Sequence, residues 1–225
     1  MKKQPPTPPQ NDQACKTRVR VRFAKRGDLR LISHRDMVRA FERLFRRVGV
    51  SLAMSQGFHP RPLMTFPDAL SLGIAAEDEV MDSTLAEQVE PEAFRTLLSD
   101  KCPPGLIIHD VQLLGAQDRK AKIHRVVYEV DLSGHEQFRS IDLQTEMDQL
   151  QQRDSLTVIR KEKEIEIDLR ESLEGLWLDG TRLMMAIQIL QQSQLQPRDI
   201  LAAIGLPSVL NEGAVLTRTK VELYP

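Results

Sequence analysis

"TRVRVRFAKRGDLRLISHRDMVRAFERLFRRVG", residues 17 to 49, is typical of a strand that leads into a helix. The first seven residues alternate strictly, so a strand would place Val19, Val21 and Phe23 on one face. Arg18, Arg20 and Arg22 would then occupy the other face. We therefore expect a half-buried strand whose apolar face meets the core and whose arginine face is open.

The second part of this stretch predicts an amphipathic helix over about residues 34 to 48. Ser33 is a good N-cap, Asp36 gives an acidic variant of the capping box, and Gly49 supplies the stop. One side of the helix is apolar and suits a sheet. The other side carries Arg35, Arg39, Arg43, Arg46 and Arg47.

The remaining patterns predict further elements in chain order. We expect strands at 50–55, 77–87 and 105–114, a helix at 90–102, and an irregular, proline-punctuated segment at 56–73. We then expect a strand at 124–132, a helix at 134–153, two or three strands within 156–190, a short helix at 196–205 and a strand at 215–224. The acidic run EDEVMD (77–82) is interpreted as solvated charge, RKEKEIEIDLRE (160–171) as an exposed or edge strand, and Trp177 as a core residue.

The order β-α-β-β-α-β occurs twice in this prediction. It indicates an α+β fold of two tandem ferredoxin-like plaits with antiparallel sheets, each backed by helices on one face. The polar stretch near 115–122 suits a boundary. We expect a disordered lead-in at 1–16, a basic first domain at 17–118 and an acidic second domain at 119–225.

The composition indicates a cytoplasmic protein. The chain is 41% apolar and 28% charged, and no stretch approaches the roughly 18 apolar residues that a membrane helix needs. The N-terminal residues lack the apolar core of a secretory signal. Cys15 and Cys102 lie far apart without a CxxC pair, so neither a disulfide framework nor a metal site is indicated, and we expect no cofactor.

The charges are divided unevenly along the chain. Residues 1–75 carry 15 Lys and Arg against 5 Asp and Glu, a net +10, and residues 76–225 carry the other 16 against 27, a net −11. Clustered guanidinium groups steer anionic partners and suit bidentate phosphate contact. The alternative is that the two ends neutralise one another across an internal interface. With only 4% aromatic residues, contact with an RNA backbone is favoured over base stacking on the sheet.

The loop QGFHPRP, residues 56 to 62, is a second candidate feature. It offers Gln56, His59 and Arg61 beside the predicted helix start, where an anion would be favoured. If His34 and His59 approach each other, they could act as acid and base on a phosphodiester, although a lone histidine is more often structural or exposed. Familiar catalytic motifs such as GxxxxGK[ST], GxGxxG, HExxH and GxSxG do not occur.

The segment from Lys25 to Gly73 resembles the signature of the radical-SAM-linked family of bacterial proteins. That pattern combines K-x-G, S-H-x-D-x-x-R, E-R-x-x-R-R, S-x-G-F-N-P-x-P and L-x-L-G. The matching residues are Lys25, Gly27, Ser33, His34, Asp36, Arg39, Glu42, Arg43, Arg46, Arg47, Ser55, Gly57, Phe58, Pro60, Pro62, Leu70, Leu72 and Gly73. His59 stands where the family commonly has Asn, and the loop lacks the more usual lysine near Arg61.

The resemblance implies a companion of a radical SAM protein that is encoded separately, because this chain has no CxxxCxxC to hold the cluster. We expect it to bind ribosomal or transfer RNA through its basic surface and to present it for modification. Two alternatives stay open: a metal-independent RNA-processing enzyme that uses His34 and His59, and a purely structural protein partner. The predicted anion-binding residues are Arg18, Arg20, Arg22, Lys25, Ser33, His34, Arg35, Arg39, Arg43, Arg46, Arg47, Gln56, Gly57, Phe58, His59 and Arg61.

Overall fold

The computed structural model describes residues 16–135, 142–190 and 195–225. In the first half of the chain the elements are β1 (Thr17–Lys25), a 3-10 helix (Gly27–Leu31), α1 (His34–Val48), β2 (Met64–Thr65), β3 (Ala75–Leu85), α2 (Pro91–Lys101) and β4 (Leu106–Leu114). In the second half they are β5 (Ile123–Asp131), α4 (Leu143–Gln151), β6 (Ser155–Arg160), β7 (Lys163–Asp168), α5 (Leu169–Ser172), β8 (Leu173–Asp179), β9 (Arg182–Gln188), α6 (Pro197–Ala203) and β10 (Leu216–Leu223).

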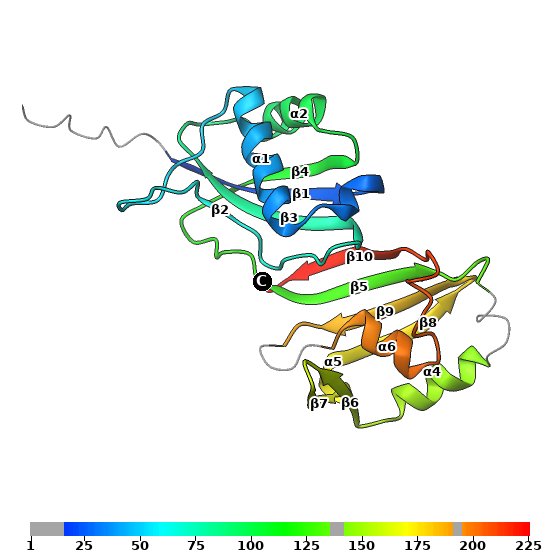
Figure 1. The fold of residues 1–225 in the computed structure, drawn as a ribbon. Helices are drawn as coiled ribbons and strands as arrows, with labels where there is room; N and C mark the ends of the chain where they lie inside the picture. Colours follow the sequence, from blue (N-terminus) through cyan, green and yellow to red (C-terminus); the bar gives the residue numbers. More distant parts are fainter. Residues whose placement is uncertain (1–15, 136–141, 191–194) are drawn as a thin grey trace, which may run out of the picture.

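These elements form a mixed α+β fold around one eight-stranded, mostly antiparallel sheet. The strands follow the order β4-β1-β3-β10-β5-β9-β8, and the short β2 pairs with β3. The hairpin β6–β7 makes a separate two-stranded sheet. Figure 1 shows α1 in front of the strands of the first half and α6 in front of those of the second half.

The strand β1 and the helix α1 form as their patterns predict. The Ser33 hydroxyl accepts a hydrogen bond from the Asp36 amide at 3.2 Å, and Gly49 ends α1 with a left-handed φ of 79°. The apolar face of β1 packs on α1, where Phe23 meets Phe41 edge-on with ring centroids 4.9 Å apart. Fully burying a side chain of this size contributes about 1.5–3 kcal/mol, so this packing holds α1 on the sheet.

The two halves have separate apolar cores. One core consists of residues between 19 and 111, on β1, α1, β3, α2 and β4. The other gathers residues from β5 to β10 with α4 and α6, and takes in Ile74 and Val80 from the first half. The linker 115–122 joins β4 to β5. Residue 118, the predicted division of the chain, lies in this linker.

The sheet is continuous, whereas the sequence prediction has two sheets. The halves meet where β10 runs parallel to β3, with the short register Thr217↔Ala75 and Arg218↔Ala76. Side chains reinforce this junction: Asp78 accepts from the Val221 amide at 3.0 Å. Because this pairing connects segments about 140 residues apart, no local sequence pattern encodes it.

Several local predictions are wrong. Residues 50–55 form only isolated bridges, Leu52 with Leu85 and Met54 with Pro62, and a proline cannot extend a ladder because it has no N–H to donate. The region 156–190 holds four strands, since the four-residue α5 turns the chain between β7 and β8. Trp177 is 40% exposed and is not a core residue. Residues 1–15 of the predicted lead-in 1–16, and residues 136–141 of the predicted helix at 134–153, lie outside the described residues.

Candidate functional site

Two of the three outward arginines of β1, Arg20 and Arg22, form pairs with acidic residues of the neighbouring strand β3. Arg20 donates from Nε and Nη2 to the Asp82 carboxylate at 2.8 and 3.0 Å, and Arg22 Nη1 lies 2.7 Å from Asp78 Oδ1. The hydrogen bond to Asp82 raises the pKa of Arg20. Opposite charges on adjacent strands attract in this way. The run EDEVMD is therefore not solvated charge: Glu79 and Asp82 are buried.

The linker 115–122 lies over the same arginine face. Arg18 Nη1 donates to the carbonyls of Gly115 at 3.1 Å and Asp118 at 2.9 Å. Arg20 also donates to the Arg119 carbonyl at 3.1 Å. The face that alternation leaves open is thus occupied by the chain itself, and a phosphate would have to displace these contacts.

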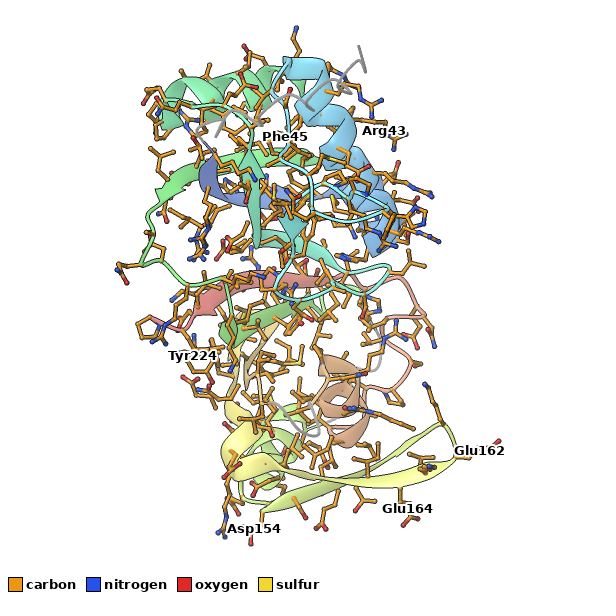
Figure 2. The ribbon with its side chains drawn as sticks, turned by 90° about the vertical axis from the view of Figure 1, so that its left-hand side faces the viewer. Arg43, Phe45, Asp154, Glu162, Glu164 and Tyr224 are labelled. Atoms are coloured by element: carbon orange, nitrogen blue, oxygen red, sulfur yellow. The ribbon has the colours of Figure 1, made fainter. Side chains whose placement is uncertain are left out.

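The arginines of α1 lie in a different environment. Arg35, Arg39, Arg43 and Arg46, which we call the α1 stripe, are all exposed and follow the spacing i, i+4, i+8, i+11. At 1.5 Å per residue, the stripe is about 16 Å long. Of these four arginines, only Arg39 has an ion-pair partner among the described residues, Asp36 at 3.3 Å, and both side chains are largely exposed. Figure 2 shows Arg43 on the outer side of α1.

Arg47 stands apart from the stripe because its Nη1 donates to the Lys101 carbonyl at 2.8 Å. This bond ties the end of α1 to the end of α2. In the described structure Arg47 is exposed, and this bond connects the two helices at the surface.

The loop 55–61 is a closed, exposed projection. The Ser55 amide donates to the Arg61 carbonyl at 2.8 Å, and the Arg61 amide donates to Ser55 Oγ at 2.9 Å. Between them, Phe58 is fully exposed at 101%, and Gln56, Gly57, His59 and Pro60 are exposed as well. The base of the loop lies beside the stripe, since Pro62 and Arg46 line the same hollow of about 390 Å³.

The two candidate histidines are placed separately. The His34 ring stands edge-on to Phe66 with centroids 5.2 Å apart, at the start of α1. His59 lies in the exposed loop. No contact between the two imidazoles is found among the described residues. The geometry therefore lends no support to joint acid–base chemistry.

A buried charged cluster lies at the junction of the halves, and the sequence patterns did not predict it. Arg218 of β10 donates to Glu79 Oε2 at 2.7 Å and to Asp68 Oδ2 at 2.6 Å, and its side chain is fully buried. Burial raises the pKa of Glu79, although the Arg218 charge opposes this. Burial likewise raises the pKa of Tyr128 and lowers the pKa of Lys25, whose Nζ donates to the Ile32 carbonyl.

The sequence does contain a signal for this cluster. In VLTRTKVEL, Leu216 and Arg218 share one face of the strand by the period of two, so an arginine occupies an inward position. A buried charge requires a partner of opposite sign. The acids at 77–82 supply it, but only the three-dimensional strand order shows which acid it is.

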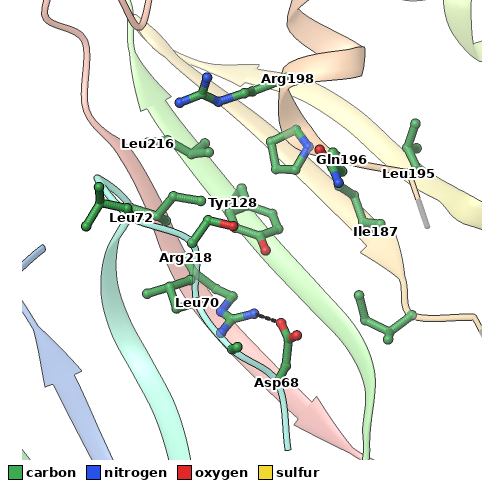
Figure 3. A pocket seen from close by; sticks show the side chains of 15 residues that line it. Asp68, Leu70, Leu72, Tyr128, Ile187, Leu195, Gln196, Arg198, Leu216 and Arg218 are labelled. Carbon is green, nitrogen blue, oxygen red and sulfur yellow. Dashed lines mark hydrogen bonds and ion pairs between the residues drawn. The ribbon is translucent and has the colours of Figure 1, made fainter. Parts of the chain in front are cut away.

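A cavity of about 380 Å³ opens beside this cluster, and we call it the junction pocket. Its walls come from the segment 68–74, the ends of β9 and β10, Tyr128 and the start of α6. Figure 3 shows Arg198 at one end of the pocket and the paired Asp68 and Arg218 at the other. Within the described ranges, no group of three or more His, Cys, Asp or Glu side chains is placed to hold a metal ion.

One cysteine can be described, and burial raises the pKa of its thiol, Cys102, to about 11. At neutral pH this thiol is therefore protonated and a poor nucleophile. Across the described segments, no helix is both long and apolar enough to cross a membrane.

The fold and its surface thus define an α+β protein with one mostly antiparallel sheet and a helix that presents a stripe of four exposed arginines, three of them without a bonded partner in the described part of the chain. The sequence profile of the family "Uncharacterized protein conserved in bacteria (DUF2344)" matches residues 18–197, and the chain belongs to this family. A search among curated proteins found no match. A solved structure described as "Crystal Structure of an Unknown Protein from Galdieria sulphuraria" is 10% identical and aligns over 93% of this chain and 99% of that one. Its TM-score is 0.24, so this likeness supports no inference.

Proposed function

We propose that this protein binds RNA through the α1 stripe and the neighbouring loop 55–61. The observation that supports this proposal is the exposure of four arginines along one helix face, three of them without a bonded partner among the described residues. Unpaired like charges on a helix repel one another, which costs stability. A polyanion removes that cost and releases counterions when it binds.

The loop adds a group that the stripe lacks. Phe58 presents its whole ring to solvent, and Arg61 follows three residues later. A base of a single strand can stack on such a ring, with roughly 1–3 kcal/mol gained per base. The combination favours a single-stranded or looped RNA, whose bases are free to stack, over a regular duplex.

The proposal extends to the biological role and to the fold. The orders β4-β1-β3-β2 and β10-β5-β9-β8 in the two halves support tandem ferredoxin-like plaits that share one sheet. The motif from Lys25 to Gly73 supports a companion role beside a separately encoded radical SAM protein in the cytoplasm. In that role, the module holds ribosomal or transfer RNA while the partner modifies it.

Filter binding to total RNA tests the proposal. The wild-type protein should retain RNA at about 50 mM salt and bind roughly fiftyfold more weakly at 200 mM, given about four neutralised phosphates. A variant with Arg35, Arg39, Arg43 and Arg46 all changed to Gln should lose this binding while its urea midpoint changes little.

A matched control separates local contact from net charge. Changing Arg153, Lys161, Lys163 and Arg170 to Gln removes four exposed positive charges from the second half. This control should bind RNA nearly as the wild type does. Equal loss in both variants, or no salt-dependent retention by the wild type, would refute the proposal.

A further inference from the structure

We infer that the junction pocket, together with an adjoining hollow, binds a small phosphate monoester with an apolar body. The proposed site lies in the groove between the two halves, at the end of α1 that is far from the loop 55–61. It does not depend on RNA binding. It rests on two cavities that share walls, on two cations at their rim and on apolar side chains within.

The adjoining hollow, about 200 Å³ in volume, provides the site for the anion, and we call it the arginine hollow. Arg30 lines it from the first half and Arg198 from the second half. None of the described residues that line it is acidic. Arg198 is exposed and has no bonded partner among the described residues, and the side chain of Arg30 donates only to its neighbour, the Gly27 carbonyl, at 3.2 Å.

Two guanidinium groups that approach from different segments suit a phosphate better than a carboxylate. A carboxylate is satisfied by one bidentate fork, whereas a phosphate monoester carries up to two charges and three terminal oxygens. Arginine is the side chain whose planar fork matches these oxygens. The absence of a lining acid leaves the two positive charges of the arginine hollow uncompensated in the described residues.

The junction pocket provides the site for the body of the ligand. It shares the lining residues Ile74, Arg198 and Leu216 with the arginine hollow, so the two cavities adjoin. A volume of about 380 Å³ lies in the range of small-molecule sites. Its apolar walls are contributed by Leu70, Leu72, Ile187, Ile189 and Leu216.

The far end of the junction pocket is fixed and polar. Arg218 is held there by Glu79 and Asp68, so its charge is already neutralised and does not compete for the phosphate. The Asp68 side chain remains 37% exposed, and Tyr128 lies between the two ends in Figure 3. The ligand is therefore oriented with its phosphate toward Arg198 and its body toward Tyr128.

Isothermal titration of the full chain with phenyl phosphate tests this inference. Saturable 1:1 binding is expected, and inorganic phosphate and phenol should each bind at least about tenfold more weakly, because each lacks one half of the ligand. Arg198→Gln and Arg30→Gln should each weaken the binding of phenyl phosphate at least about tenfold, because each variant loses one charge-assisted contact. Arg153→Gln, which removes an exposed arginine that lines neither cavity, should bind like the wild type.

Three results would overturn the inference. These are the absence of saturable binding, unchanged affinity in both rim variants, or benzoate binding as tightly as phenyl phosphate. RNA retention by Arg198→Gln is expected to equal that of the wild type, so failure here is distinguishable from failure of the RNA-binding proposal.

Discussion

Replacing Arg218 by methionine should expose how strongly the junction depends on one buried ion pair. The substitution keeps an unbranched side chain but leaves Glu79, whose side chain is only 6% exposed, without its partner. Breaking a buried pair by removing one member costs about 3–5 kcal/mol, because the remaining charge stays in a poorly solvated site. Asp68, at 37% exposure, is rehydrated more easily and adds little to this cost.

The loss of stability caused by Arg218→Met should depend on pH. Burial already raises the pKa of Glu79 in the wild type, and loss of the Arg218 charge raises it further. A carboxyl whose pKa is raised in the folded state holds its proton more tightly there than in the unfolded chain. Lowering the pH from 8 toward the unfolded value of about 4.3 therefore protonates Glu79 and reduces the deficit.

Urea unfolding at pH 8 and at pH 5 measures both effects, with the midpoint and slope fitted at each pH. Adding Glu79→Gln to the variant should restore at least half of the lost stability at pH 8, since it removes the stranded charge. Arg170→Met is the control, because the Arg170–Asp154 pair is about 70% exposed and should contribute no more than about 0.5 kcal/mol. A cost below about 1 kcal/mol for Arg218→Met, or a deficit that grows at pH 5, would refute this reasoning.

Three further predictions concern other parts of the fold. Asp82→Asn should lower the free energy of unfolding by about 1–3 kcal/mol, because the Arg20 guanidinium loses a charged acceptor; a urea midpoint equal to the wild type would contradict this. With the other cysteine replaced by serine, Cys102 should react with iodoacetamide at pH 8 on the order of a hundredfold more slowly than free cysteine, since its pKa is about 11. Gly105→Ala should cost more than about 1 kcal/mol in thermal or urea unfolding, because φ is +86° and an added Cβ would lie 2.4 Å from the Arg26 carbonyl oxygen.

Local patterns in the sequence predicted much of the first half. The alternation of β1 and the helical spacing of α1 depend on residues close together in the chain, and both elements form as expected, with Ser33 and Gly49 as caps. The exposed arginines of α1 were also predictable, since a helix that packs one face on a sheet leaves the other in solvent.

The fate of the β1 arginines was not predictable in the same way. The acidic partners of Arg20 and Arg22 lie 56 to 62 residues away on β3, and the choice of partner follows from the register Arg20↔Asp82. Register depends on how strands are ordered in the sheet, which the spacing of residues does not specify. The positive charge of residues 1–75 is therefore partly balanced within the protein by the acidic residues that begin directly after residue 75.

The junction was missed for a related reason. Glu79 and Arg218 are separated by 139 positions, and each lies in a segment whose charges look solvent-exposed when it is considered alone. The junction pocket exists only because β3 and β10 pair, which brings the segment 68–74 against α6. Sites at such junctions depend on tertiary topology, and their residues are found from the structure.

The salt dependence of RNA affinity tests the central claim, that the α1 stripe remains free for a polyanion while the β1 arginines serve the fold. Binding of a fluorescent single-stranded RNA is measured from about 50 to 300 mM salt for the wild type and for the variant with the four stripe arginines changed to Gln. We expect a slope of log affinity against log salt near −3 for the wild type, with its magnitude reduced by about 0.7 for each arginine removed. Equal slopes for the two proteins, or a wild-type slope near zero, would contradict it.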